Sequence, residues 1–488
     1  MPCTLSAVQS VLPQAYLHGG GGAEFSGLTA SSREANPGSL FVCLPGARTD
    51  GHQFAPDAVA RGAVGLVVER VLPELHVPQL VVPSSQLALA HLAALFTGRP
   101  TDRLTTVGIT GTNGKSTTTF LAEAVLRAGG YDPGLIGTIE ARVGSERRTL
   151  PNTTPDSLTL YRLFSEMVAA GQDAVVMEVS SIGLEAGRVH QIPFDVAVFT
   201  NLTQDHLDYH KTMKAYQEAK RRLFTEHQVA GRRHEPAAVV NLDDPAGASM
   251  LEGFRGQKLT YGRSSEAMLR ASDIEPREAG VFFRFTDPAG ATHPVQLGLG
   301  GLFNVANALA ALGIAWALGI EPGRAVAALE SVDSVPGRFQ EIRQGQDFRV
   351  VVDYAHTPDG LKNLLESARR VSAGRVLVVF GCGGDRDRGK RPQMGKLAGD
   401  LADVVIVTSD NPRSEDPLAI LTDIEGGLVG KSYTLEPDRA RAIALAIDQA
   451  RSGDVVVIAG KGHENYQIVG SQVLAFDDAE VAREALRR

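Results

Sequence analysis

The sequence has few cysteines, no long apolar run and no secretory leader pattern. Its 488 residues include Cys3, Cys43 and Cys382, which lie far apart and lack the spacing of a disulfide framework or a zinc site. No apolar stretch approaches the roughly 20 residues that a membrane-spanning helix requires, and the N-terminus lacks a basic start followed by an apolar segment. We therefore expect a cytoplasmic protein without membrane insertion, whose thiols stay reduced.

An excess of positive charge is also missing. Lysine and arginine number 48 against 56 aspartates and glutamates, which gives a net charge of −8. Because nucleic-acid-binding domains usually carry a basic face, we expect no nucleic-acid partner. The remaining composition, 43% hydrophobic and 21% charged, is that of an ordinary globular protein, and its length exceeds what one hydrophobic core supports.

Short Val- and Ile-rich runs alternate with helical patterns along most of the chain. This alternation is typical of parallel sheets covered by helices. Two polar stretches that contain proline and glycine, 97–103 and 331–339, interrupt it. We therefore predict an α/β protein of three domains: an N-terminal α/β domain at 1–99, a central phosphate-loop domain with a parallel sheet at 100–333, and a C-terminal Rossmann-like domain at 334–488.

The stretch TTVGITGTNGKSTTTF, residues 105–120, runs from an apolar strand through glycines into a helix. Such a turn presents backbone amides and the positive end of the helix dipole to a phosphate. Lys115 supplies a charge for the outer phosphates, and the hydroxyl of Ser116 or Thr117 suits Mg²⁺. The glycine that should precede Gly-Lys by five residues stands one position earlier, at Gly108, so a plain strand-to-helix turn is the alternative. The residues predicted to hold ATP here are Gly111, Thr112, Asn113, Gly114, Lys115, Ser116 and Thr117.

Two further apolar runs end in polar residues. DAVVMEVSS, residues 173–181, is a probable strand that ends in Glu178, and FDVAVFT is followed by Asp205 and His206. Carboxylates close to a phosphate loop suit a magnesium nucleotide. The alternative is that these residues belong to surface loops.

Lys220 occupies an unexpected position. In KAYQEAKRRLF a helix places Tyr216, Lys220, Leu223 and Phe224 on one stripe. The lysine therefore faces inward, where an aliphatic residue is expected. The alternative is a lysine whose stem runs along the edge of the core and whose amine reaches water.

The last segment contains four probable strands, FRVVVDY, RVLVVFG, DVVIVTS and DVVVIAG. Each is followed by polar or glycine-rich residues, in turn AHTPDG, CGGDRDRGK, DNPRSEDP and KGHENYQ. Open parallel sheets bind their ligands at the carboxyl ends of their strands. We therefore predict a ligand site at this edge of the sheet.

Several motifs occur in one order between residues 108 and 464: GTNGKSTTT, EVSS, NLTQDHLDYH, GLFNVANALAAL, VPGRF, DYAHTPDGL, GDRDRGKRP, DNPR and GKGHE. The set resembles the Mur ligases, the ATP-dependent amino-acid ligases of peptidoglycan synthesis. It is similar to those members that add a diamino acid to the D-glutamate of UDP-N-acetylmuramoyl-L-alanyl-D-glutamate. The resemblance implies ligation through an acyl phosphate by a cytoplasmic monomer that uses ATP and Mg²⁺.

The resemblance also assigns roles around the phosphate loop. Family members carry a carbamylated lysine at the position of Lys220, which implies an N6-carboxylysine that binds magnesium. The implied catalytic residues are Lys115, Glu178, His206 and Lys220, and the implied metal ligands are Ser116, Glu178, His206 and Lys220. Further implied nucleotide contacts are Asn304, Asn307, Arg338, Asp353 and His356. Helix capping is the alternative for Asn304.

The uridine nucleotide and its peptide are expected in the first two domains. By resemblance, Ser32 and the Ala47-Arg48-Thr49 loop lie near the uridine, although Ser31 stands where the family often has aspartate. A simple turn residue is the alternative for Ser32. The residues implied to contact the muramoyl peptide are Thr153, Thr154, Ser180 and Arg188.

The incoming diamino acid is expected at the C-terminal strand ends. The implied contacts are Arg386, Asp410, Asn411, Pro412, Arg413, Gly460 and Glu464. Arginine can bind a carboxylate through two parallel hydrogen bonds, and Asp410 and Glu464 suit ammonium groups. In the family, DNPR is associated with meso-2,6-diaminopimelate, whose distal carboxylate can pair with Arg413. L-lysine and L-ornithine lack that carboxylate and stay open as alternatives, and DNPR is by itself a common turn sequence.

Three other functions remain to be weighed. Folylpolyglutamate synthetase shares GTNGK but usually lacks DNPR and HTPD, and a sister ligase that adds D-Ala-D-Ala is disfavoured on similar grounds. A nucleotide sensor without turnover would not need Lys115, Glu178 and Lys220 together with an amino-acid pocket. Phosphate release that requires both the muramoyl dipeptide nucleotide and a diamino acid separates the ligase from the sensor.

Overall fold

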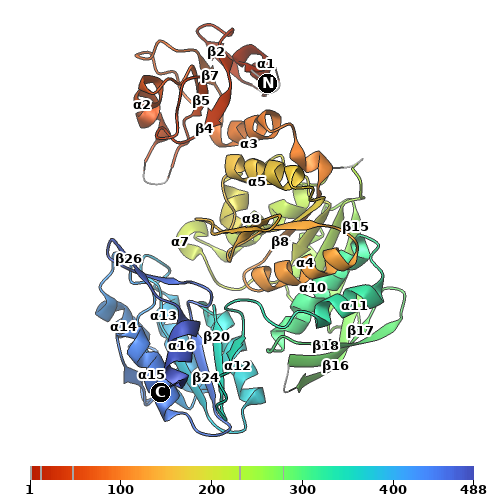
Figure 1. Ribbon diagram of the computed structural model, residues 1–488, viewed down its shortest axis with the longest axis vertical. Helices are drawn as coiled ribbons and strands as arrows, with labels where there is room; N and C mark the ends of the chain where they lie inside the picture. Colours follow the sequence, from red (N-terminus) through yellow and green to blue (C-terminus); the bar gives the residue numbers. More distant parts are fainter. Residues whose placement is uncertain are drawn as a thin grey trace. The chain divides into compact units, whose positions relative to one another are not determined.

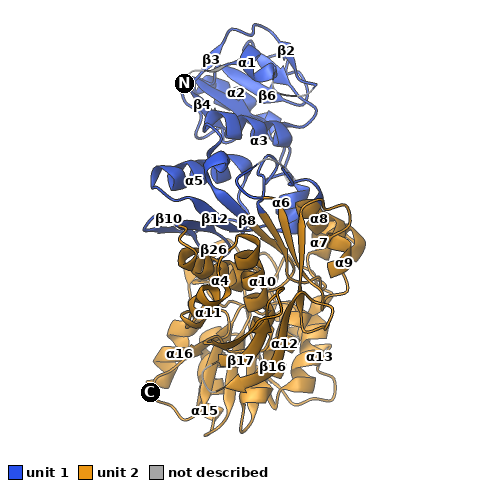
Figure 2. Cartoon of the chain, turned by 90° about the vertical axis from the view of Figure 1, so that its right-hand side faces the viewer, with its two compact units in different colours: residues 1–106, 132–195, 225–234 blue, residues 107–131, 196–224, 235–488 orange. Residues whose placement is uncertain are grey.

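The computed structural model describes residues 3–10, 12, 14–46, 49–229, 232–277 and 280–487. The chain divides into two compact units, drawn in different colours in Figure 2. Unit 1 contains residues 1–106, 132–195 and 225–234, and unit 2 contains residues 107–131, 196–224 and 235–488. Each unit combines sheets with covering helices, as expected for an α/β protein.

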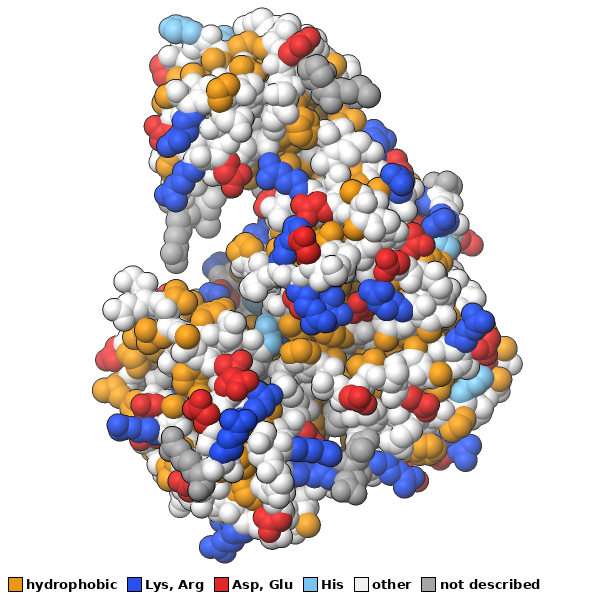
Figure 3. Space-filling view, viewed as in Figure 1, with side chains coloured by type: hydrophobic (Ala, Val, Ile, Leu, Met, Phe, Trp, Pro, Cys, Tyr) orange, Lys and Arg blue, Asp and Glu red, His pale blue; other side chains and the backbone are white. Residues whose placement is uncertain are grey.

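The surface carries side chains of both charges, and the helices show no pattern of a membrane span in the part of the chain that is described. On the face drawn in Figure 3, acidic and basic side chains are interspersed rather than gathered by sign. Of the helices in the described part of the chain, none is long and apolar enough to span a bilayer.

Unit 1 begins with a small, mostly parallel sheet. Its elements are β1 (Cys3–Thr4), α1 (Leu5–Gln9), β2 (Tyr16–His18), β3 (Glu24–Phe25), β4 (Gly27–Thr29), β5 (Ser39–Val42), α2 (Ala55–Ala60), β6 (Gly65–Val68), β7 (Gln79–Val81) and α3 (Ser85–Phe96). Strands β4 to β7 run parallel, and β2 pairs antiparallel with β7. Helix α2 packs on Phe41, Leu66 and Val68 of this sheet through Ala55 and Ala58.

The remainder of unit 1 contains a buried strand that ends at the carboxylate of Glu178. Its elements are β9 (Pro133–Ile136), β10 (Ala141–Val143), β11 (Glu146–Arg148), α5 (Ser157–Ala169), β12 (Ala174–Glu178) and α6 (Ser181–Glu185). Strand β12 pairs parallel with β9 and is buried at every position, as its apolar sequence predicts. Helix α5 starts where the Asp156 carboxylate accepts a hydrogen bond from the Thr159 amide (3.1 Å).

The first part of unit 2 is built around the strand that enters the phosphate loop. Its elements are β8 (Thr105–Thr110), α4 (Lys115–Ala128), β13 (Val196–Phe199), α7 (Leu207–His210), α8 (Met213–Thr225), β14 (Ala237–Asn241), α9 (Gly247–Met250), β15 (Gln257–Gly262), β16 (Leu269–Arg277), β17 (Gly280–Thr286), β18 (Thr292–Leu297), α10 (Phe303–Ala317) and α11 (Pro322–Glu330). Strands β8, β13, β14, β15 and β16 pair parallel in this order, and β16, β17 and β18 form an antiparallel meander. The apolar helix α10 packs against both α4 and the sheet, which explains why it is hydrophobic on most sides.

The second part of unit 2 is a doubly covered parallel sheet. Its elements are β19 (Gln340–Ile342), β20 (Arg349–Asp353), α12 (Pro358–Val371), β21 (Val376–Phe380), α13 (Lys390–Leu401), β22 (Val404–Val407), α14 (Pro417–Glu425), β23 (Thr434–Leu435), α15 (Arg439–Gln449), β24 (Val455–Ala459), β25 (Tyr466–Val469), β26 (Gln472–Ala475) and α16 (Asp478–Leu486). The strand order is β19-β20-β24-β21-β22-β23, with β19 antiparallel to the rest. Alternate strand residues pack on α12, α13 and α14 on one face and on α15 and α16 on the other (Figure 1). The carboxyl ends of β20, β24, β21 and β22 therefore meet at one edge.

Candidate functional site

The phosphate loop joins β8 to α4 through two glycines in left-handed conformations. Gly111 has φ +151° and Gly114 has φ +84°, and no side chain caps the start of α4 at Lys115. A Cβ atom at Gly111 would overlap with the Thr200 hydroxyl, and one at Gly114 would overlap with the Asn307 amide oxygen. Both the backbone angles and the space therefore require glycine at these two positions, and contact of the loop with a phosphate stays a prediction.

Gly111→Ala is expected to lower the stability of the protein. Alanine would combine an unfavourable φ with overlap on Thr200, and strain of this kind costs about 1–3 kcal/mol. Gly130→Ala is the matched control, because Gly130 also has positive φ (+91°) but open space around its Cα atom. In urea unfolding, Gly111→Ala should show the lower midpoint of the two variants. Equal midpoints would contradict the role of the overlap.

Two lysine amines meet at one carbonyl of this loop. Lys115 Nζ donates to the carbonyl oxygens of Gly111 (2.9 Å) and Thr112 (2.8 Å). Lys220 Nζ donates to the same Gly111 oxygen at 2.8 Å and lies 4.2 Å from the centre of the Tyr216 ring. Lys220 is only 1% exposed, so the inward orientation predicted from the helical stripe is confirmed and the solvent-reaching alternative is wrong.

The surroundings of Lys220 favour its neutral amine. Burial, and then the charge of Lys115, hold the pKa of Lys220 well below its usual range. A neutral amine is the nucleophilic form, which can add CO₂. Within the described part of the chain, no three His, Cys, Asp or Glu side chains are grouped as a metal site. The Ser116 hydroxyl, the His206 ring and a carbamylated Lys220 fit Mg²⁺ only together with phosphate oxygens, the way this ion is usually held at nucleotide sites.

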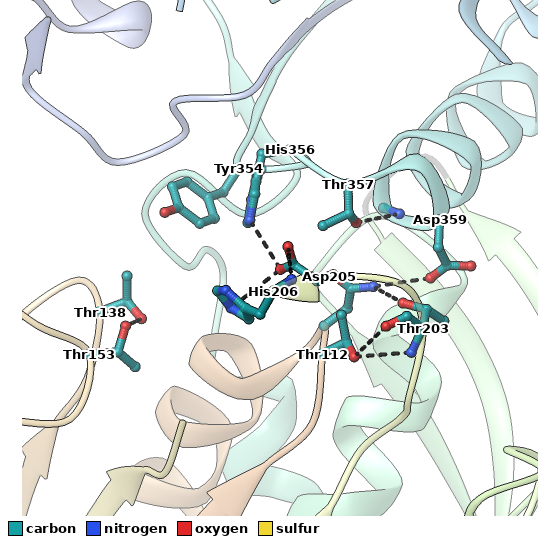
Figure 4. Close-up of polar contacts among 12 residues, drawn as sticks. Thr112, Thr138, Thr153, Thr203, Asp205, His206, Tyr354, His356, Thr357 and Asp359 are labelled. Atoms are coloured by element: carbon teal, nitrogen blue, oxygen red, sulfur yellow. Dashed lines mark hydrogen bonds and ion pairs between the residues drawn. The ribbon is translucent and has the colours of Figure 1, made fainter. Parts of the chain in front are cut away.

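Asp205 lies between two histidines, as Figure 4 shows. Its Oδ2 atom is 3.4 Å from His206 Nε2 and 3.7 Å from His356 Nε2. Burial lowers the pKa of His206 to about 4, with Lys220 and Lys115 acting in the same direction and Asp205 opposing them. His206 is therefore neutral at pH 7, the form in which imidazole binds metals.

Arg338, one of the nucleotide residues predicted near the second boundary, contacts the end of the phosphate loop, and so does Asp359 of α12. Arg338 Nη2 donates to Ser116 Oγ at 2.8 Å, and Asn113 Nδ2 donates to Asp359 Oδ2 at 3.0 Å. Asp353 accepts from the Phe339 amide at 2.7 Å, and burial raises the pKa of this carboxyl. Asp359 was not singled out from the sequence, because only the fold brings α12 to the loop.

Asn304 and Asn307 support the loop from α10. Asn304 Nδ2 donates to the Gly300 carbonyl at 2.6 Å, and Asn304 Oδ1 accepts from Asn307 Nδ2 at 2.8 Å. Leu302 is the residue that precedes the helix, so the capping alternative for Asn304 is wrong. The Asn307 amide oxygen lies against Gly114, and contact of either residue with a nucleotide stays a prediction.

Glu178 is held by a threonine that sequence reasoning missed. Its carboxylate accepts from the Thr138 amide at 2.8 Å and from the Thr138 hydroxyl at 2.9 Å. The Thr138 hydroxyl is also 2.9 Å from the Thr153 hydroxyl (Figure 4). Glu178 is 1% exposed, so the surface-loop alternative is wrong. It belongs to unit 1 and the other implied metal ligands to unit 2, so the full metal set stays a prediction.

The other residues predicted to contact the muramoyl peptide in unit 1 are mutually connected. Thr154 Oγ1 donates to the Glu178 carbonyl (3.0 Å) and accepts from the Ser180 amide (2.9 Å). Arg188 Nη1 donates to the Thr154 carbonyl at 2.9 Å. Ser180 also caps α6 through the Gly183 amide at 3.0 Å. These bonds place Thr154, Ser180 and Arg188 in one polar cluster.

Ser32 lies in a turn after β4. The neighbouring Ser31 amide donates to the Thr29 hydroxyl at 3.0 Å, which shapes this turn. Ala47 and Arg48 of the predicted uridine loop lie outside the described residues. Contact of Ser32 with a uridine nucleotide therefore stays a prediction.

The amino-acid residues at the carboxyl ends of β22 and β24 form a buried charged cluster. The Asp410 carboxylate accepts from the Asn411 amide at 2.6 Å and lies against Gly460, whose φ is +120°. Asn411 Nδ2 donates to Glu464 Oε2 at 2.7 Å. The fully buried Lys461, which sequence reasoning missed, donates to Asn411 Oδ1 (3.2 Å) and Glu464 Oε2 (3.0 Å).

The two predicted arginines lie on neighbouring loops. Arg386 is exposed, and Arg413 is half-buried with φ +54°. Arg413 Nη1 donates to the Gly384 carbonyl at 2.8 Å, and its amide donates to the Ile468 carbonyl at 3.0 Å. The DNPR segment, with Pro412 buried, is therefore held on both sides and is more than an isolated turn.

Protein-family models match most of the chain. The model described as the Mur ligase family catalytic domain matches 24–97, the Mur ligase middle domain matches 109–315, and the Mur ligase glutamate ligase domain matches 337–462. The chain belongs to the Mur ligase family. The resemblance and the three-domain α/β fold are thereby confirmed, whereas the boundaries after residues 99 and 333 stay predictions.

Relatives with high sequence identity over nearly the whole chain share one activity name. UDP-N-acetylmuramoyl-L-alanyl-D-glutamate--2,6-diaminopimelate ligase of Geobacillus thermodenitrificans is 48% identical over 488 residues, which cover 99% of each chain. The ligase of the same name from Listeria monocytogenes is 45% identical over 467 residues, 95% of each chain. A solved structure with that name has a TM-score of 0.71 and 34% identity, and the match covers 100% of this chain and 99% of the other.

Proposed function

We propose that the protein is an ATP-dependent ligase that joins meso-2,6-diaminopimelate to the D-glutamate of UDP-N-acetylmuramoyl-L-alanyl-D-glutamate. We further propose that it acts as a cytoplasmic monomer in the synthesis of peptidoglycan precursors. The observation that carries the proposal is the charged cluster at the carboxyl ends of β22 and β24, where Asn411 joins the Asp410 segment to Glu464. The charges of Glu464, Asp410, Arg413 and Arg386 all act on Tyr466, so carboxylates and guanidinium groups lie in one region. Such a cluster offers partners for both ends of an amino acid. The 48% identity to a diaminopimelate ligase supports this reading over folylpolyglutamate synthetase, a D-Ala-D-Ala ligase or a nucleotide sensor.

The reaction proceeds in two displacements. The glutamyl γ-carboxylate attacks the γ-phosphorus of ATP, and ADP leaves, which gives an acyl phosphate. The amine of the diamino acid then attacks the acyl carbon, phosphate leaves, and the nitrogen loses a proton as the amide forms. No covalent bond to the enzyme is required.

The chain contributes orientation and charge to both steps. Lys115 and the first-turn amides of α4 stabilise the charge on the transferred phosphoryl group. Arg338, which donates to the Ser116 hydroxyl at the start of α4, adds a second positive charge there. Ser116, His206, Glu178 and a carbamylated Lys220 would hold a magnesium ion, which would supply positive charge near the phosphates.

Phosphate release is expected to require all three substrates. With ATP present, omission of either the muramoyl dipeptide nucleotide or the diamino acid should reduce phosphate release to background. In competition, meso-diaminopimelate should be incorporated in preference to L-lysine and L-ornithine, as read by mass spectrometry of the product. A preference for lysine or ornithine would refute the assignment of the amino acid. ATP binding without coupled phosphate release would refute the ligase.

A further inference from the structure

A fully buried ion pair lies next to the charged cluster of Asp410, Asn411, Lys461 and Glu464. Arg439 Nε and Nη2 donate to Asp478 Oδ1 and Oδ2, both at 2.7 Å, and neither side chain has any exposed area. Arg439 opens α15 and Asp478 opens α16, so the pair joins the amino ends of two helices on one face of the sheet. A cation in the first turn opposes the helix dipole, so Arg439 is not placed to stabilise α15.

The guanidinium of Arg439 reaches the ends of two strands. Nη2 donates to the Ala459 carbonyl at 3.0 Å, and Nη1 lies 3.4 Å from the Ser409 carbonyl that it faces. Ala459 ends β24 immediately before Gly460, and Ser409 directly precedes Asp410. The rigid, forked guanidinium of Arg439 therefore contacts both backbone segments that carry the charged cluster, the one before Asp410 and the one before Gly460.

Arg439 also acts electrostatically on Asp410. Burial by itself would raise the pKa of Asp410, but the charge of Arg439, then that of Lys461, and the hydrogen bond from the Asn411 amide together keep this pKa below its usual range. The Asp410 carboxylate therefore stays ionised, which is the form that pairs with an ammonium group.

We propose that Arg439, held in place by Asp478, is a positioning residue that sets the separation of the Asp410 loop and the Gly460–Glu464 loop and thereby the affinity for the diamino acid. The inference rests on the proposed function, because it assumes that these loops bind that substrate. Arg439 itself is too deeply buried to touch the substrate. Its effect acts through Asp410 and Gly460.

Two variants test this role. Asp478→Asn keeps the shape of the side chain but removes the charge that orients Arg439. Arg439→Met combined with Asp478→Leu removes one cation and one anion together, so the net charge of the region is unchanged, and apolar replacement of a buried ion pair is often tolerated. In both, the KM for meso-diaminopimelate should rise at least about tenfold, while the KM values for ATP and the muramoyl dipeptide nucleotide change less than about twofold.

Asp454→Asn is the matched control. Asp454 is 3% exposed and accepts from the Arg375 amide and guanidinium, both at 2.7 Å, so it joins β21 and β24 at their amino ends. Asp454 belongs to the same sheet as Asp410, but it lies at the amino ends of the strands and not at their carboxyl ends. This variant should alter thermal unfolding without a selective change in the KM for the diamino acid.

The outcomes separate positioning from general stability. An unchanged KM for the diamino acid in the double variant would overturn the proposal. An equal rise in the KM for the diamino acid in Asp454→Asn would also overturn it. So would a fall in the amount of active enzyme in all variants with no change in any KM. Phosphate release by the wild-type protein without a diamino acid would refute the proposed function itself. Because this assay uses the wild-type protein alone, its failure is distinguishable from failure of the positioning role.

Discussion

Lys220→Met is expected to abolish ligation while the protein remains folded. The loss in kcat should be at least about a thousandfold, the upper range for removal of one preorganised electrostatic group. Methionine matches the length of lysine and suits the stripe that Lys220 shares with Tyr216 and Leu223 on α8. The unfolding midpoint should therefore stay the same or rise, since a buried amine is costly.

The pH dependence of stability gives an independent check on the state of Lys220. The pKa of this amine is lowered in the folded protein, so the unfolded chain binds the additional proton at neutral pH. Lys220 therefore destabilises the fold below its unfolded pKa, and this effect disappears as the pH rises through that value. The stabilisation from Lys220→Met should be larger at pH 7 than at pH 10, measured by urea unfolding.

Carbamylation of Lys220 can be measured directly. Intact mass spectrometry in bicarbonate should show an adduct with the mass of one CO₂ in the wild type and none in Lys220→Met. Lys214→Met is the matched control, because Lys214 is exposed on the same helix. Its activity and adduct should equal those of the wild type. Undiminished turnover in Lys220→Met would contradict a catalytic role for the lysine.

The features that sequence reasoning predicted are those with a local periodic signal. The helical stripe correctly placed Lys220 on the same buried face of α8 as Tyr216. The apolar runs correctly predicted the buried strand that ends at Glu178 and the strands of the last sheet. The carboxyl ends meet because parallel strands align in register. These inferences needed only the period of a helix or a strand and the rule for open parallel sheets.

The features that were missed depend on contacts between distant segments. Thr138 meets Glu178 across 40 positions, and Arg439 meets Asp478 across 39. No local pattern marks either pair. Asn304 was open to a capping role because helix starts are poorly defined by sequence. Helix α10 begins at Phe303, two residues earlier than a capping Asn304 requires, and the Asn304 amide donates to the Gly300 carbonyl instead. Placement of single side chains required the fold.

Arg413→Ala is expected to reduce kcat/KM for meso-diaminopimelate by at least about a hundredfold, because a charge-assisted pair contributes about 1.5–3 kcal/mol per hydrogen bond. The same change should leave any activity with L-lysine nearly unaltered, since lysine has no distal carboxylate that Arg413 could bind. Arg388→Ala is the matched control: this exposed arginine of the neighbouring GDRD loop pairs with Glu415 at 3.2 Å. Arg413→Lys should restore part of the loss, because it keeps the charge but not the fork.

The pattern across amino acids decides how Arg413 acts. Its Nη1 atom already donates to the Gly384 carbonyl, so Arg413→Ala also removes a bond between the DNPR and GDRD loops. If that structural bond were its main contribution, activity with meso-diaminopimelate, L-lysine and L-ornithine would fall by the same factor. A loss confined to meso-diaminopimelate instead requires a partner that only this substrate has, its distal carboxylate. Steady-state kinetics with the three amino acids, at saturating ATP and muramoyl dipeptide nucleotide, therefore distinguish recognition of the substrate from support of the loop.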